Sequence, residues 1–66
     1  MTHKQWTARL NLKTRAVRRA LRCSNTTAAY IAARSLGFEL CGAACFGHGV
    51  TVRALYRDDS SFLTFL

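Results

Sequence analysis

The chain has 66 residues, and its ten Lys and Arg residues against three Asp and Glu residues give a formal charge of +7. This length allows one small domain and excludes a catalytic domain joined to a separate binding domain. Half of the residues are apolar, which suits a folded core and excludes a disordered basic tail. No apolar segment follows Met1 closely and none is long enough to cross a bilayer, so we expect a cytoplasmic protein without a signal peptide.

The first two elements are predicted to be strands. Apolar and polar residues alternate strictly over Gln5–Lys13, and such a period of two is typical of a half-buried strand. Arg15–Cys23 is interpreted as the second strand of a hairpin turning near Lys13-Thr14, although the turn lacks the Asn-Gly or Asp-Gly pair that tight hairpins prefer. The two segments together also fit a single helix, because five apolar residues fall within one arc that only Lys13 interrupts: Trp6, Leu10, Val17, Ala20 and Leu21.

A helix is predicted next. Ser24-Asn25-Thr26-Thr27 supplies N-cap residues, Ala28–Leu36 continues as an alanine-rich helix, and Gly37 stands where helices commonly end. Tyr30 and Arg34 are expected to face outward, and Tyr30 is the better candidate for stacking on a base. Trp6 is expected in the core. The inward stripe of the helix is expected to consist of Ala28, Ile31, Ala32, Ser35 and Leu36.

Strands are predicted for the rest of the chain. Phe38–Phe46 is one strand with a bulge at Gly42, and the Gly47-His48-Gly49 turn leads to a second strand at Val50–Arg57. Asp58–Ser61 is a turn before a short apolar strand, Phe62–Leu66. The prediction is therefore an α+β fold in the order ββαββ(β), in which one helix lies on one face of an antiparallel sheet of four or five strands.

A short helix cannot cover such a sheet, so one sheet face is expected to be bare. Eight of the ten basic residues are arginines, which bind phosphate or carboxylate through two parallel hydrogen bonds. We therefore expect the bare face to bind nucleic acid, or the nucleic-acid-handling surface of a host nucleoprotein complex; the plain alternative is a solvated basic surface. The alternation places six basic residues there: Arg9, Lys13, Arg18, Arg22, Arg53 and Arg57.

The cysteine and histidine residues do not form a persuasive catalytic or metal site. Cys23, Cys41, Cys45 and His48 are the residue types of a Cys₃His zinc site, but Cys41 and Cys45 would lie about 13 Å apart on one strand. A Cys45–His48 nucleophile pair lacks an orienting third group. We therefore expect reduced thiols, no cofactor and no enzymatic activity.

Two alternatives use other parts of the chain. In a helix-turn-helix interpretation, Thr14–Arg22 and Thr26–Ser35 are the helices and Phe46–Arg57 is a wing, but Arg34 is then the only long polar residue available for reading bases. In an interaction module, the C-terminal strand provides an edge for a homodimer, unless it completes the sheet of its own chain. The residues of that edge are Phe62, Leu63, Phe65 and Leu66.

The expected order of elements resembles that of small phage anti-CRISPR proteins of the type I-F class. Some of these have a β-hairpin, a capped alanine-rich helix like Ser24–Leu36, and further strands. The resemblance covers most of the chain but includes no identifying motif, so no functional residue is transferred. It implies a non-enzymatic inhibitor of phage or mobile-element origin that binds a guide-RNA surveillance complex and obstructs its DNA path.

Overall fold

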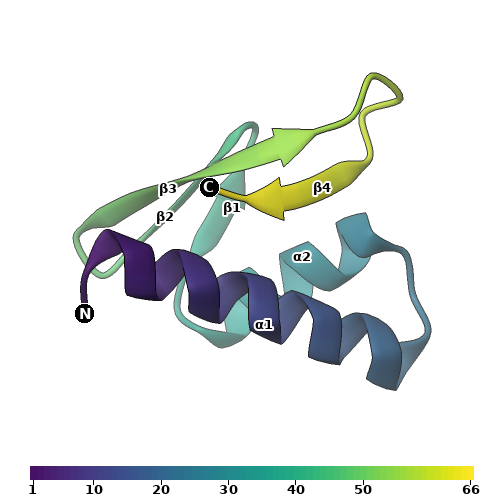
Figure 1. Cartoon of the computed structure of the whole chain (residues 1–66), viewed down its shortest axis with the longest axis horizontal. Coiled ribbons are helices and arrows are strands. Elements are labelled where there is room, and N and C mark those ends of the chain that lie inside the picture. Colours follow the sequence, from purple (N-terminus) through teal and green to yellow (C-terminus); the bar gives the residue numbers. More distant parts are fainter.

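The computed structural model describes all 66 residues and consists of two helices followed by a four-stranded antiparallel sheet (Figure 1). Both helices lie on the same face of the sheet, and neither is long and apolar enough to cross a membrane. The α+β class and the antiparallel sheet are confirmed, whereas the predicted ββαββ order and the single helix are wrong. The elements are α1 (His3–Leu21), α2 (Asn25–Ser35), β1 (Glu39–Cys41), β2 (Ala44–Gly47), β3 (Val50–Tyr56) and β4 (Phe62–Phe65).

Helix α1 replaces the hairpin predicted for the first part of the chain. A capping box begins the helix: the Thr2 hydroxyl accepts a hydrogen bond from the Gln5 N–H, and the Gln5 side chain accepts one from the Thr2 N–H. No glycine or proline interrupts the residues that follow, which are mainly good helix formers. Arg22 ends the helix in the left-handed conformation, with φ at 51°.

The alternation over Gln5–Lys13 is misleading because only part of its apolar side is buried. Leu12 is 66% exposed, although a strand would place it beside Leu10 in the core. The buried stripe of α1 is instead Leu10, Thr14 and Val17, which share one helical face. Thr14 is tolerated there because its hydroxyl donates to the Leu10 carbonyl at 2.7 Å and so leaves no polar group unpaired.

Helix α2 forms close to the predicted place, with Ser24 as its N-cap. Tyr30 and Arg34 are exposed as predicted. Ile31 and Ser35, which were expected to face inward, are also exposed. The reason is that α2 is covered on two sides, by α1 and by the sheet, and only small residues allow both contacts. Its buried residues are all alanines: Ala28, Ala29, Ala32 and Ala33.

The predicted strand Phe38–Phe46 is in fact two strands, β1 and β2, joined by a tight turn. Gly42 has a φ of +59° and forms the two-residue loop with Ala43, so it marks a turn rather than a bulge. The following turn is found as predicted, with positive φ at both His48 (50°) and Gly49 (74°). Such a pair matches the twist of the strands on either side.

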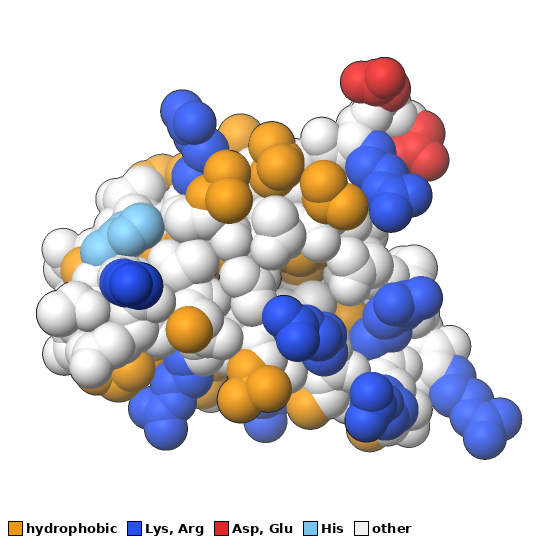
Figure 2. Space-filling view, in the orientation of Figure 1, with side chains coloured by type: hydrophobic (Ala, Val, Ile, Leu, Met, Phe, Trp, Pro, Cys, Tyr) orange, Lys and Arg blue, Asp and Glu red, His pale blue; other side chains and the backbone are white.

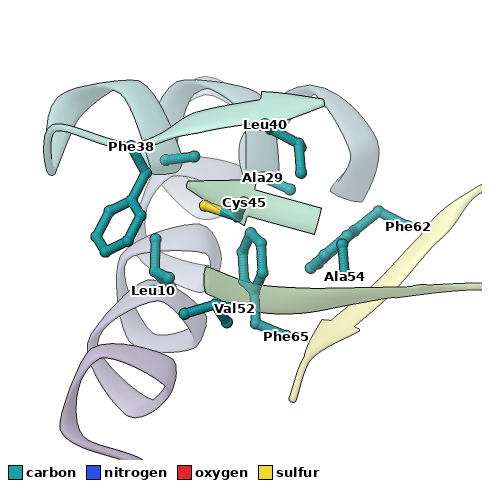
Figure 3. Packing of buried hydrophobic residues seen from close by; sticks show 10 residues of the cluster. Leu10, Ala29, Phe38, Leu40, Cys45, Val52, Ala54, Phe62 and Phe65 are labelled. Atoms are coloured by element: carbon teal, nitrogen blue, oxygen red, sulfur yellow. The ribbon is translucent and has the colours of Figure 1, made fainter. Parts of the chain in front are cut away.

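The core lies between the helices and the inner face of the sheet (Figure 3). The predicted alternation of β3 is confirmed, with Val52 and Ala54 buried and Arg53 exposed between them. The outer face of the sheet is bare, as expected. The core cluster contains Leu10, Ala29, Ala33, Phe38, Leu40, Cys45, Val52, Ala54, Phe62 and Phe65.

Strand β4 completes the sheet of its own chain, and side chains from both helices occupy its free edge. Asn11 donates from Nδ2 to the Phe65 carbonyl at 3.0 Å and accepts at Oδ1 from the Phe65 N–H at 2.8 Å. Asn25 donates to the Phe62 carbonyl at 2.9 Å, and the Thr26 hydroxyl accepts from the Phe62 N–H at 2.9 Å. These hydrogen bonds take the place of a further strand, so the edge is closed to strand addition.

Candidate nucleic-acid interface

Arginine side chains gather over the C-terminal half of α1 (Figure 2). Arg15, Arg18, Arg19 and Arg22 are exposed and, together with Cys23, line a hollow of about 500 Å³. Spacings of three and four residues place the four side chains on one side of the helix. We refer to these four residues as the arginine cluster and to the space that they line as the cluster hollow.

The ends of the two helices influence the charge at the arginine cluster in opposite ways. The C-terminal end of α1 carries partial negative charge, which stabilises the positive charges of Arg18 and Arg19 in its last turn. The N-terminal end of α2 lies close by and adds partial positive charge. No salt bridge within 4.0 Å joins the cluster to a carboxylate. The cluster therefore keeps a surplus of positive charge available to an anionic ligand.

The structure brings together only two of the six basic residues predicted as a site, Arg18 and Arg22. Four of the six lie on or directly after α1 rather than in strands, so the prediction of one basic sheet face is wrong. The other four are dispersed: Arg9 and Lys13 lie on another side of α1, Arg53 on the outer face of the sheet and Arg57 directly after β3.

The strand interpretation missed Arg15 and Arg19, which belong to the arginine cluster. In a strand these two residues would point away from Arg18 and Arg22, because successive side chains alternate between faces. In a helix all four lie on one side. A helical period over residues 15–22 was thus the signal in the sequence that could have found the complete cluster.

The bare outer face of the sheet is mainly apolar. Arg53 is its one basic residue within the strands, and it pairs with Ala44 across β2 and β3. Three of its apolar side chains are exposed at 48%, 38% and 41%: Phe46, Leu55 and Leu63. Phe62 and Phe65, which were expected at an oligomer edge, are instead buried in the core. This face therefore lacks the charge density expected of a phosphate-binding surface.

Cys45 and His48 serve the fold, whereas Cys41 and His3 are exposed. Cys45 lies in the core, where burial raises the pKa of its thiol to about 11. His48 packs flat on Trp6 with ring centroids 4.5 Å apart, and its Nε2 donates to the Leu36 carbonyl at 2.7 Å. Trp6 packs against the core, as predicted. No group of three metal-binding side chains comes together in the structure.

Two further hollows adjoin α2, and Tyr30 lines both of them. Tyr30 is 49% exposed. The Phe46 hollow, about 640 Å³, is lined by Tyr30, Arg34, Gly37, Phe38, Glu39, Leu40 and Phe46. The Tyr56 hollow, about 400 Å³, is lined by Tyr30, Gly42, Ala43, Tyr56, Arg57 and Ser60.

Comparison with known proteins gives no relative: no family model, curated protein or solved structure matches this chain. The resemblance to type I-F anti-CRISPR proteins depends on a β-hairpin before the alanine-rich helix, and residues 3–21 form a helix instead. The order of elements thus no longer supports that resemblance. Function must be inferred from the residues of the site.

Proposed function

We propose that the protein is a non-enzymatic nucleic-acid-binding protein whose arginine cluster binds the phosphate backbone. The observation that carries this proposal is the presence of four guanidinium groups on one side of a helix, around one hollow and without carboxylate partners. Arginine forms paired hydrogen bonds with phosphate, and the overall charge of +7 draws polyanions towards the protein.

Backbone binding is favoured over sequence-specific reading. The helix-turn-helix alternative has two consecutive helices with a short connection, Arg22 to Ser24, between them. However, Asn25 and Thr26 at the start of α2 are engaged by β4 and are not free to contact bases. Arg34 is then the only long polar reader on α2, so we expect little dependence of affinity on sequence.

Salt titration of a labelled duplex tests this function. Affinity should fall by about 0.9 log units per log unit of salt for each phosphate that the protein neutralises. The R15Q/R19Q variant should lose about tenfold in affinity and reduce the salt slope by about two. The matched R9Q/K13Q variant removes the same charge from another side of α1 and should lose less.

Two results would contradict the proposal. Equal losses in R15Q/R19Q and R9Q/K13Q would mean that net charge acts without a site, and affinity independent of salt would exclude backbone binding. A pull-down from host lysate, with and without nuclease, separates direct binding of nucleic acid from contact with a host protein. We expect nuclease to abolish the capture.

A further inference from the structure

Tyr30 presents an exposed aromatic ring on the surface of α2. Its side chain is 49% exposed, and it separates two hollows rather than packing into the core. Ile31, the next residue of α2, is 37% exposed but lines neither hollow. Tyr30 is the one residue that lines both of these hollows.

Each hollow combines Tyr30 with an arginine and at least one further aromatic side chain that is not fully buried. The Phe46 hollow contains Phe46 and Arg34, and the Tyr56 hollow contains Tyr56 and Arg57. The Tyr56 ring is held in place because its hydroxyl donates to the Gly42 carbonyl at 2.9 Å. Aromatic walls accept the faces of any nucleobase, and guanidinium groups both bind phosphate and interact with aromatic rings.

We propose that Tyr30 is the centre of a base-stacking site for single-stranded nucleic acid, with one base in each hollow; this inference rests on the proposed binding of nucleic acid. Single strands are favoured because bases inside a duplex stack on one another and do not present their faces to a side chain. The volumes of about 640 and 400 Å³ lie in the range of small-ligand sites.

The carboxylates around the hollows favour a base over a bare phosphate. Glu39 lines the Phe46 hollow, and Asp58 and Asp59 follow Arg57 in the turn beside the Tyr56 hollow. The pKa of Asp59 is lowered, first by hydrogen bonds from Ser61, so this carboxylate is ionised at neutral pH. Glu39 thus offsets Arg34 in one hollow, and the two aspartates offset Arg57 at the other, so neither hollow carries the surplus positive charge of a phosphate site. Stacking on neutral rings does not need that charge.

The N-terminal turn of α2 connects this site with the arginine cluster. Cys23, just before the turn, lines the cluster hollow. Thr26, within the turn, accepts a hydrogen bond from Phe62, and Ser60 close by in the chain lines the Tyr56 hollow. The whole molecule measures only 29 × 26 × 16 Å, so one extended strand is long enough to place bases beside Tyr30 and its backbone on the cluster.

Fluorescence anisotropy with a labelled deoxythymidine strand of about 12 nucleotides tests the site. Y30A should weaken binding by about tenfold or more, because stacking on one ring is lost from two bases. Y30F keeps the ring and should bind like the unmodified protein. I31A is the matched control, because it removes a neighbouring exposed apolar side chain that lines neither hollow.

Inorganic polyphosphate, which has charge but no bases, separates this inference from the proposed function. Y30A should bind polyphosphate normally, whereas R15Q/R19Q should bind both polyphosphate and the oligonucleotide more weakly. If Y30A keeps full affinity for the oligonucleotide while R15Q/R19Q loses it, the stacking site is refuted and backbone binding stands. If the unmodified protein binds the duplex but not the oligonucleotide, the stacking site is likewise refuted and backbone binding stands; if it binds neither, both proposals fail.

Discussion

The side chain of Asn11 makes the hydrogen bonds to Phe65 that a neighbouring strand would otherwise make. Its amide satisfies both the N–H and the carbonyl of Phe65, and its Oδ1 also accepts from the Thr64 hydroxyl at 3.1 Å. An asparagine suits this position because its side chain carries a donor and an acceptor in the same arrangement as the backbone. A hydrophobic residue would fill the space but leave the backbone N–H and carbonyl of Phe65 unpaired.

We therefore expect N11A to lower the free energy of unfolding by about 1–3 kcal/mol, because it leaves partly buried backbone groups without partners. Urea denaturation measures the change. R9A, an exposed substitution on the same helix, should stay within about 0.5 kcal/mol of the unmodified protein. Unchanged stability of N11A would show that water satisfies this edge equally well.

Burial of Cys45 makes stability depend on alkaline pH. The folded protein raises the thiol pKa from 9.0 to about 11 through desolvation, so the neutral thiol is favoured by folding. This contribution to stability is fully present below pH 9 and is lost as the pH rises through 11, because the unfolded chain releases the proton more easily.

Denaturation titrations between pH 8 and 11 should show this loss. The C45V variant should lack this part of the decline, whereas C41S, at an exposed position, should retain it. A thiol reagent near neutral pH should modify Cys41 well before Cys45. Equal rates of modification at these two residues would contradict the burial of Cys45.

At the scale of elements, the alanines of α2 set how closely the two helices approach. Ala28 and Ala32 are fully buried against Val17 of α1. Small residues at these positions let the helix backbones come close and let α2 touch the sheet at the same time. The close packing of the two helices thus depends on the small side chains at these positions.

We expect A32L to lower the free energy of unfolding by about 1–3 kcal/mol, because three added carbon atoms force the helices apart. Thermal or urea denaturation measures the loss. S35L introduces the same side chain at an exposed position of α2 and should change stability little. A neutral or stabilising A32L would mean that the α1–α2 contact has room to adjust.

Local signals in the sequence predicted some elements correctly and failed for others. The capped helix α2, the alternation of β3 and the His48-Gly49 turn each depend on neighbouring residues, and all three were found. Helix α1 was not, because its residues satisfy both a period of two and a helical arc. Two signals favour the helix: the Thr2–Gln5 capping box, which was overlooked, and the absence of turn residues near Lys13, which was noted but given too little weight.

The arginine cluster could not be recognised until α1 was recognised as a helix, since the same residues fall on opposite faces of a strand. No local sequence pattern could have predicted that the edge of β4 is closed. Asn11 and Phe65 are 54 positions apart, and Asn25 and Phe62 are 37 apart. Only the packing of the complete chain brings such partners together.

For the whole molecule, the last strand is a structural requirement rather than an accessory. Phe62 and Phe65 are 2% and 1% exposed, and both belong to the core. Leu63 and Leu66 are exposed and available for other contacts. Of these four apolar residues, the two phenylalanines thus stabilise the core, and the two leucines do not.

We expect a chain ending at Ser61 to lose cooperative folding, because two core side chains and the pairing partner of β3 disappear. Circular dichroism and size-exclusion chromatography detect the unfolding. The L63S/L66S variant should remain folded and keep its oligomeric state. A truncated protein that stays folded but dissociates from a dimer would instead support an interface at this strand.

The closure of β4 by residues from α1 and α2 also has a consequence for biosynthesis. Both helices are translated first, yet their partners at Phe62 and Phe65 are made some 37 to 54 residues later. Until those partners have left the ribosome, the complete sheet cannot form, and the apolar sides of the two helices are not fully buried. The domain can therefore reach its native state only after Phe65 has left the ribosome, and until then the chain is exposed to proteases and chaperones.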